Sequence, residues 1–375
     1  MVTVRSFAKI NIGLRLGDVR PDGFHELRTV YQTIGIFDLI GVQAVRGAGV
    51  EIHCADARVP TDETNTCYRV AEKVIKSLGA KQRLVIRIEK RLPVQGGVGG
   101  ASSNAVALLL AIERVLKRDL SAPERLRIAA EVGSDLPLFL VGGTTLGVGR
   151  GEEVYPLPDL PTTACVMAAP NVGVSTPQAF RDWDDSQGKL RSAAQTRAAF
   201  DFTQDKPGPM RFASEPTTPI AQSRTLEAGG RYADKGKLTL PSTSDRMNEF
   251  GRTVSSWLSG YSSKSGKPAS GVPAWGRGRA ENPLLDLVHT GIENDFEKVV
   301  FPKYPELCEI KQVLLKAGAF YASLSGSGSA LYGLFRTRQQ AATCTNLLKK
   351  HGVPATATTT LTRQQYWKKF LVSGF

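Results

Sequence analysis

The sequence predicts an α+β fold, and three features support this prediction. Short apolar segments alternate with turn residues through the first fifty positions, which is typical of β-strands. Apolar, Ala-rich segments at residues 105–116 and 123–132 have the composition and length of helices. The chain has 375 residues and is 41% hydrophobic, so it can form one large or two ordinary domains with a sizeable core.

The expected strands begin at the N-terminus. Residues 2–5, 10–14 and 39–42 read as strands, and Arg20-Pro21-Asp22-Gly23 between them has turn chemistry. Residues 84–88 form a further expected strand, which ends before Pro93. Strands are therefore expected to precede the first long helix.

The second half of the chain changes in character. Residues 181–280 are rich in Gly, Pro and Ser, poor in aliphatic side chains and positively charged, which predicts a loop-rich insertion. Its aromatic residues, among them Trp183, indicate that part of it packs. Regular patterning then returns, with a helix expected around residues 307–315 and a strand–turn–strand segment at 321–335.

Composition excludes several classes of protein. There is no apolar run of about 18 residues and no signal-peptide pattern at the start, so we expect a cytoplasmic protein without a membrane span. The 5 Cys and 4 His are scattered without metal-ligand spacing, so no metal site is predicted. The net charge of +13 favours an anionic partner such as nucleic acid, an acidic membrane surface or a phosphorylated small molecule.

The most informative segment is a glycine-rich turn that runs into the first long helix. Gly96, Gly97, Gly99 and Gly100 let backbone amides approach an anion closely, and the helix behind them offers unpaired N–H groups. This arrangement predicts a polyphosphate cradle, although a flexible hinge or a tight strand–helix turn would have similar residues. Neither the Walker A nor the Rossmann pattern fits the segment.

A second element, residues 323–330, is also made of glycine, serine and small residues. It could wrap a phosphate with amides and hydroxyls, or it could be an ordinary turn between two strands.

Two isolated charges stand out. Lys9 lies in an apolar strand and Asp135 lies among apolar residues, and such charges are rarely buried unless paired. If the two side chains meet, Lys9 would hold Asp135 ionised and ready to orient or deprotonate a substrate hydroxyl. The alternative is two solvated charges at the surface.

Taken in this order, these elements resemble the GHMP kinase superfamily, named for galactokinase, homoserine kinase, mevalonate kinase and phosphomevalonate kinase. The resemblance covers about residues 3–180 and 281–335. It rests on Ser6–Asn11, Arg20–Leu27, residues 93–106, Gly133–Leu140 with Gly142–Thr144 and Gly149–Glu152, Pro170–Pro177, Asn294–Glu297 and Leu324–Ser329.

The resemblance implies a two-lobed fold, with an ATP-binding N-terminal domain at 1–160 and a C-terminal domain at 161–375 that contains the insertion. Residues 20–27 are most similar to the members that use ATP and Mg²⁺ to phosphorylate the 2-hydroxyl of a cytidine diphosphate methylerythritol, in the non-mevalonate isoprenoid pathway. No nucleic-acid or membrane partner is implied, and no side chain is assigned to Mg²⁺.

The resemblance also implies site residues. Asp135 would be the base and Lys9 would steady it. The phosphates of ATP would lie on Pro93, Gln95, Gly96, Gly97, Val98, Gly99, Gly100, Ala101, Ser102 and Ser103. The phosphate acceptor would contact Asn11, Phe24, His25, Thr176 and Phe180, with Phe24 and Phe180 stacking on cytosine.

Some residues depart from the family pattern. Gln95, Val98 and Ala101 stand where the family usually has Gly, Leu and Gly, while Phe24 replaces a Tyr and Ser134 an Ala. Two alternatives stay open at this point. One is a related kinase that acts on homoserine or mevalonate, against which Gly23-Phe24-His25 counts. The other is a basic nucleic-acid-binding protein, although no recognised RNA-binding motif is present.

Overall fold

The first two strands form one long antiparallel hairpin. In the computed structural model, which describes residues 1–94, 96–188 and 292–372, β1 (Val2–Val19) pairs along its length with β2 (His25–Val45). The predicted turn joins them, where the amide of Gly23 donates to the carbonyl of Arg20 at 3.0 Å. The three expected strands at 2–5, 10–14 and 39–42 are therefore parts of two continuous ones.

The hairpin belongs to a six-stranded sheet of order β3-β4-β2-β5-β6, with β1 paired to β2. Its other strands are β3 (Val50–Cys54), β4 (Arg83–Glu89), β5 (Thr144–Val148) and β6 (Glu153–Pro156). The pairing of β3 with β4 is parallel and the remaining pairings are antiparallel.

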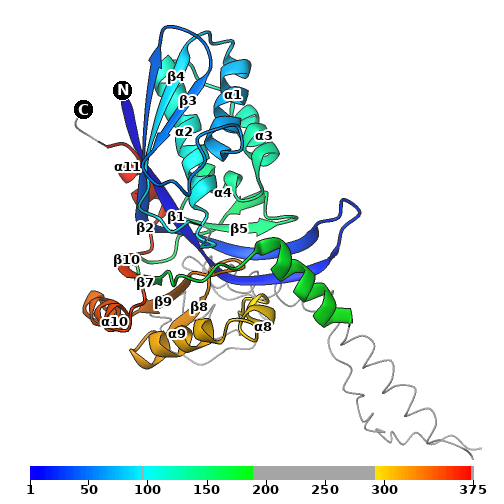
Figure 1. The fold of residues 1–375 in the computed structure, drawn as a ribbon, viewed down its shortest axis with the longest axis vertical. Helices are drawn as coiled ribbons and strands as arrows, with labels where there is room; N and C mark the ends of the chain where they lie inside the picture. Colours follow the sequence, from blue (N-terminus) through cyan, green and yellow to red (C-terminus); the bar gives the residue numbers. More distant parts are fainter. Residues whose placement is uncertain (95, 189–291, 373–375) are drawn as a thin grey trace, which may run out of the picture.

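Four helices lie beside this sheet (Figure 1). They are α1 (Thr66–Leu78), α2 (Gly100–Leu116), α3 (Ala122–Val132) and α4 (Leu136–Val141). Helix α2 contacts both β1 and β2, and its apolar side chains are central to the core of this half of the molecule. The predicted helix at 123–132 is confirmed as α3.

The second sheet is antiparallel and has the order β10-β7-β9-β8. Its strands are β7 (Ala164–Ala168), β8 (Tyr321–Leu324), β9 (Leu331–Phe335) and β10 (Ala355–Thr359). Helices α9 (Pro305–Lys316) and α10 (Arg338–Lys350) pack against it, and α8 (Glu297–Val300) lies to the right of α9 in Figure 1. The expected helix at 307–315 and strand–turn–strand at 321–335 are confirmed.

A shared apolar cluster joins the two sheets. Ile10 and Ile12 of β1 pack in one cluster with Met167 of β7 and Tyr332 of β9. The hydroxyl of Tyr332 also donates to the carbonyl of Asn11 at 2.6 Å. The strand that carries Lys9 is therefore held by both halves of the molecule.

The C-terminal helix α11 (Arg363–Phe370) returns to the first sheet, where the amide of Val372 donates to the carbonyl of Thr3 at 3.2 Å. Within the described ranges, no helix is long and apolar enough to cross a membrane.

The start of the predicted insertion needs a correction. Residues 176–188 form a helix, so 181–188 are not loop. Trp183 is 1% exposed and packs in the core around the second sheet, which outweighs the polar composition of its neighbours. Residues 189–280 of the predicted insertion lie outside the described residues.

Candidate active site

The two isolated charges meet. Lys9 is buried in β1, with its side chain 3% exposed, and its Nζ lies 3.4 Å from Oδ2 of Asp135. Asp135 precedes α4, yet its carboxylate does not cap that helix and its side chain is 35% exposed. The pair therefore presents a carboxylate that is both oriented and accessible, and the alternative of two solvated charges is wrong for Lys9.

Three more polar side chains surround the pair. Lys9 Nζ donates to Asn11 Oδ1 at 2.6 Å, and Asn11 Nδ2 donates to Thr29 Oγ1 at 2.9 Å. The Tyr31 hydroxyl donates to Oδ1 of Asp135 at 3.0 Å, and Lys9 Nζ lies 5.5 Å from the centre of its ring. Burial, followed by the charge of Asp135, raises the pKa of Tyr31 well above its usual value. The phenol therefore stays a hydrogen-bond donor.

The glycine-rich turn passes beside Lys9. Gly97 and Gly99 have φ of +72° and +70°, a region that glycine enters without steric cost. A Cβ at Gly99 would lie 3.1 Å from Cγ of Lys9, and one at Gly97 would collide with the carbonyl oxygen of Ser325. The close packing of this turn explains the need for glycine at both positions.

The turn leads directly into α2, which begins at Gly100 and not at residue 105 as expected. Gly99 precedes the helix and offers no capping side chain. The first helical hydrogen bond found here joins the Ser103 amide to the Gly99 carbonyl at 2.8 Å. Helix geometry thus leaves the amides of Gly100, Ala101 and Ser102 without intrahelical acceptors, at the positive end of the helix dipole. Such a helix start can bind an anion.

The prediction that Ser103 binds phosphate needs a correction. Its side chain is 1% exposed, and its hydroxyl donates to the carbonyl of Phe7 at 2.6 Å and contacts Ser6 Oγ at 2.6 Å. Because both its hydroxyl and its amide are used inside the protein, Ser103 supports the turn from behind.

Three other residues of the turn that were predicted to contact the phosphates lie in different surroundings. Val98 is 1% exposed and packs in the apolar core, so only its backbone can face a ligand. Pro93 lines the large cavity described below. Gln95 lies outside the described residues.

A buried carboxylate holds the chain before the turn. Asp38 is fully buried and accepts hydrogen bonds from Lys90 Nζ at 2.7 Å, from Asn104 Nδ2 at 3.0 Å, and from the amides of Arg91 and Leu92 at 2.6 and 2.7 Å. These contacts join β2, the segment after β4 and the first turns of α2. Asp38 thereby fixes the strand end against the helix start.

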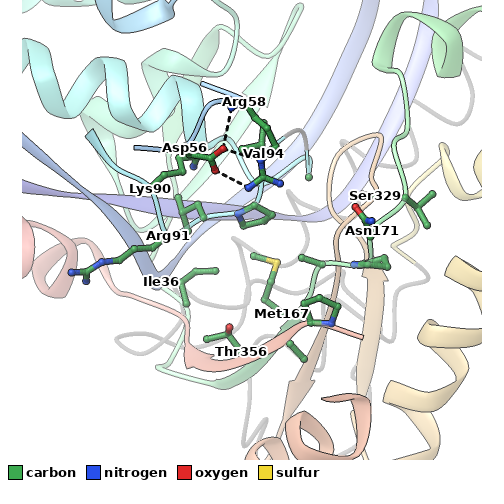
Figure 2. Close-up of a pocket in the computed structure, with 18 of the residues that line it drawn as sticks. Ile36, Asp56, Arg58, Lys90, Arg91, Val94, Met167, Asn171, Ser329 and Thr356 are labelled. Carbon is green, nitrogen blue, oxygen red and sulfur yellow. Dashed lines mark hydrogen bonds and ion pairs between the residues drawn. The ribbon is translucent and has the colours of Figure 1, made fainter. Parts of the chain in front are cut away.

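A cavity of 1120 Å³ opens between the two halves of the molecule (Figure 2). Lys90, Pro93 and Gly96 line it on the side of the first sheet, and Met167 and Ser329 line it on the side of the second. Neither Lys9 nor Asp135 is among its described lining residues. The glycine-rich turn connects the two places, because Gly96 borders the cavity and Gly99 packs on Lys9.

One ion pair marks the upper wall of this cavity. Arg58 donates to both carboxylate oxygens of Asp56, at 2.9 and 2.7 Å, as the dashed lines of Figure 2 show. Hydrogen bonds from the side chain and backbone of Arg58 lower the pKa of Asp56 to about 2.

The second glycine and serine element packs against the first. The hydroxyl of Ser325 donates to the carbonyl of Gly97 at 3.0 Å, and the amide of Ala330 donates to the carbonyl of Gly96 at 3.1 Å. A Cβ at Gly326 would lie 3.5 Å from Lys9 Nζ. The alternative of an ordinary turn between two strands is therefore incomplete, since this element forms one wall of the site.

Aromatic side chains gather at the tip of the hairpin. The ring of Phe24 is 51% exposed, and the guanidinium of Arg150 lies 4.9 Å from its centre. The ring of His25 stacks on Phe180 at 5.0 Å with an interplanar angle of 23°. The structure thus brings Phe180 and His25 together, while the ring of Phe24 lies against Arg150.

The two remaining predicted residues lie beside the second glycine and serine element and beside Lys9. Thr176 Oγ1 is 2.7 Å from the hydroxyl of Ser327 in the second glycine and serine element. Asn11 is 1% exposed and accepts a hydrogen bond from Lys9, so its side chain positions the lysine.

Sequence reasoning missed Tyr31, Asp38 and Asp184, whose carboxylate lies 2.7 Å from Nε2 of His25. A tyrosine or an aspartate in a strand or helix gives no sign of its partner. Only the unusual burial of a charge at Asp38, inside an apolar segment of β2, could have been noticed beforehand.

Comparison with known proteins matches two family models, "GHMP kinases N terminal domain" over residues 65–143 and "GHMP kinases C terminal" over residues 280–353. A 4-diphosphocytidyl-2-C-methyl-D-erythritol kinase of Solibacter usitatus is 34% identical over 336 residues, 89% of this chain and 81% of the relative. The enzyme of the same name from Desulfitobacterium hafniense is 31% identical over 91% of this chain and 89% of its own length.

Solved structures share the fold. A 4-(cytidine 5'-diphospho)-2C-methyl-D-erythritol kinase aligns over 96% of this chain and 98% of its own with a TM-score of 0.61 and 24% identity. A homoserine kinase from Cytophaga hutchinsonii aligns over 98% of this chain and 96% of its own, with a TM-score of 0.58 and 18% identity. The expected two-lobed kinase fold is confirmed.

Proposed function

Since the chain belongs to the 4-diphosphocytidyl-2-C-methyl-D-erythritol kinases of the GHMP superfamily, we propose that it transfers the terminal phosphoryl group of ATP to the 2-hydroxyl of that cytidine diphosphate sugar alcohol. Membership makes it an ATP-dependent small-molecule kinase. The observation that supports the chemistry best is the contact between Lys9 and Asp135 beside a glycine-rich helix start.

Asp135 is the proposed general base. A carboxylate that is 35% exposed can reach a substrate hydroxyl, and its two oxygens are oriented by Lys9 and Tyr31. As the hydroxyl attacks phosphorus, its proton passes to Asp135, and the bond between the terminal phosphorus and the bridging oxygen of ATP breaks. Lys9 sits where it stabilises the negative charge that develops on the attacking oxygen.

The amides of Gly100, Ala101 and Ser102 are the proposed cradle for the phosphates of ATP. They point out of the start of α2, and Gly97 and Gly99 in the turn before them carry no side chains that could block an anion. The rest of the nucleotide fits the 1120 Å³ cavity, which begins where the turn begins at Pro93 and Gly96.

Mg²⁺ is expected to accompany ATP. Among the described residues no three His, Cys, Asp or Glu side chains gather as a metal site. This fits an ion that is held largely by phosphate oxygens and water, as Mg²⁺ commonly is in kinases. Its contribution would be to neutralise phosphate charge during transfer.

The cytosine would lie at the hairpin tip, against the exposed ring of Phe24 and near His25 and Phe180. Stacking on such rings is worth about 1–3 kcal/mol per base. Thr176 would contact the remainder of the substrate, whereas Asn11, which is 1% exposed, would act through Lys9.

We also propose a domain boundary near residue 160, with ATP binding assigned to residues 1–160 and the C-terminal domain to 161–375. The first sheet ends with β6 at Pro156 and the second begins with β7 at Ala164, which supports this position.

The test is turnover with ATP and a panel of acceptors. We expect phosphorylation of 4-diphosphocytidyl-2-C-methyl-D-erythritol, and at most traces of product with homoserine or mevalonate. Preference for either of those acceptors would contradict the proposal, because it would leave the aromatic residues of the hairpin tip without a role.

A further inference from the structure

One face of the helix at residues 176–188 looks toward the hairpin. Thr176, Phe180 and Asp184 follow one another at intervals of four residues and therefore share a face. Phe180 stacks on the ring of His25, and Oδ1 of Asp184 lies 2.7 Å from Nε2 of the same ring. The imidazole is thus held by two residues of one helix.

The helix itself is firmly placed. Trp183 anchors it in the core around the second sheet with 1% of its surface exposed. Asp182, one turn from Gln178, accepts a hydrogen bond from Lys303 Nζ at 2.6 Å, which lowers the pKa of that carboxyl. Asp184 therefore reaches His25 from a fixed backbone, and the His25 side chain is only 8% exposed.

The contact restricts the chemistry of the imidazole. A carboxylate can only accept a hydrogen bond, so Nε2 must carry a proton when it bonds to Asp184. In a neutral imidazole the other nitrogen, Nδ1, then has a lone pair and can only accept. The hydrogen bond at one ring nitrogen decides what the other offers to a ligand.

We propose that Asp184 is a positioning residue that sets the tautomer of His25 and thereby makes the site select cytosine over uracil. The inference rests on the proposed function, which puts the base of the substrate beside His25. The Nδ1 lone pair accepts a hydrogen bond from the 4-amino group of cytosine. Uracil has a carbonyl oxygen there, so two acceptors would face each other and one buried group would lose its partner.

The tautomer can be observed directly, because the chain has only 4 His. In ¹⁵N-histidine spectra at about pH 9, where ordinary imidazoles are neutral, His25 is assigned by the signal lost in His25→Gln. We expect protonated Nε2 and unprotonated Nδ1. Asp184→Ala should shift His25 toward the mixture of tautomers of a free imidazole, while Asp185→Ala, an exposed neighbour on the same helix, should leave it unchanged.

Selectivity is measured by calorimetric binding of CDP and UDP. The wild type should bind CDP more tightly, and Asp184→Ala should lower its affinity for CDP about 3- to 10-fold, the range expected for one lost hydrogen bond. The affinity of Asp184→Ala for UDP should stay within about twofold of the wild-type value. The ratio of the CDP affinity to the UDP affinity therefore falls. In turnover, KM for the cytidylyl substrate should rise while KM for ATP and kcat change by less than about twofold. Asp184→Asn, which keeps an oxygen acceptor, should recover part of the CDP affinity.

The outcomes separate this inference from the function on which it rests. Wild-type protein that does not distinguish CDP from UDP would count against the proposed cytosine site. If Asp184→Ala still distinguishes CDP from UDP as the wild type does, or if His25 carries its proton on Nδ1, the proposed role of Asp184 is wrong. The proposed cytosine site would not be affected by either result.

Discussion

Lys9 shows how the surroundings of one side chain can define a catalytic group. Its ammonium is buried between Asn11, Tyr31 and Asp135, and Asn11 and Asp135 supply polar contacts to it. Asn11 is in turn held by Thr29 on the neighbouring strand. The position of the Asp135 carboxylate is thus determined by residues on two strands and one helix start.

Tyr31 offers a test of this arrangement. Tyr31→Phe removes a donor to the ionised carboxylate while keeping the ring over Lys9. Without this donor Oδ1 of Asp135 is held less firmly, so kcat should fall about 3- to 10-fold. KM for ATP should change by less than about twofold, because Tyr31 contacts the base and not the start of α2.

The control is Tyr155→Phe, since Tyr155 is exposed in β6 and contacts Glu153. A kcat for Tyr31→Phe that equals the wild-type value would mean that the hydrogen bond does not act on the base.

Individual residues were predictable from the sequence to different degrees. Lys9 and Asp135 could be recognised because a charge within an apolar segment must find a partner. Tyr31 could not, since a tyrosine in a strand is as well explained by core packing. Its place beside Asp135 depends on the register that sets Asn11 opposite Tyr31, and β1 carries a register shift between Phe7 and Lys9.

The glycine-rich turn connects the strand end to α2 and has little freedom in its sequence. The neighbours of Gly97 are backbone atoms of the second glycine and serine element, which cannot move aside as a side chain can. The hydrogen bonds that Asp38 accepts also fix the segment that leads into the turn.

Gly97→Ala tests the turn. The new Cβ would collide with the carbonyl of Ser325, in addition to the cost of a positive φ, about 1–2 kcal/mol. We expect KM for ATP to rise at least about tenfold and the melting temperature to fall. Gly79→Ala is the matched control, because Gly79 has φ of +59° with nothing within 4 Å of its Cβ.

Gly79→Ala should cost stability alone and leave KM for ATP unchanged. Equal effects of both variants on KM would mean that the turn plays no special part in nucleotide binding.

The helices and strands were well predicted where local pattern decides them, as for α3 and for the segment at 321–335. The start of α2 differs from the expected residue 105, because the helix begins at Gly100. In the structure Ser103 and Asn104 lie inside the helix and their side chains bond to Phe7, Ser6 and Asp38. Such tertiary partners have no local signature.

In the whole molecule, the hairpin of β1 and β2 brings the proposed substrate residues together. It belongs to the first sheet, packs on the second through Ile10 and Ile12, and carries Phe24 and His25 at its tip. A long hairpin could not be predicted from short apolar segments, because pairing over this length depends on contacts with both sheets.

The insertion gives a prediction for the molecule as a whole. The sequence features of the kinase lie outside residues 190–278, and the C-terminal family model begins at residue 280. Few aliphatic side chains in this segment argue against an independent core. A variant that joins Lys189 to Arg279 through a short Gly/Ser linker should fold and keep phosphoryl transfer within about tenfold.

Limited proteolysis of the full chain is the companion measurement. Early cleavage within 190–278 with activity retained would agree with the deletion. A deletion variant that is soluble and inactive would show that the segment belongs to the working enzyme.

The most direct test of the mechanism compares the wild type with Asp135→Asn, using ATP and 4-diphosphocytidyl-2-C-methyl-D-erythritol. The substitution keeps the size of the side chain and removes its charge, and a general base contributes about 10²–10⁴-fold. We expect kcat to fall by that factor, with an unchanged melting curve and with ATP and CDP bound as in the wild type. Retention of more than about half of the wild-type kcat would contradict the role of Asp135 as the base.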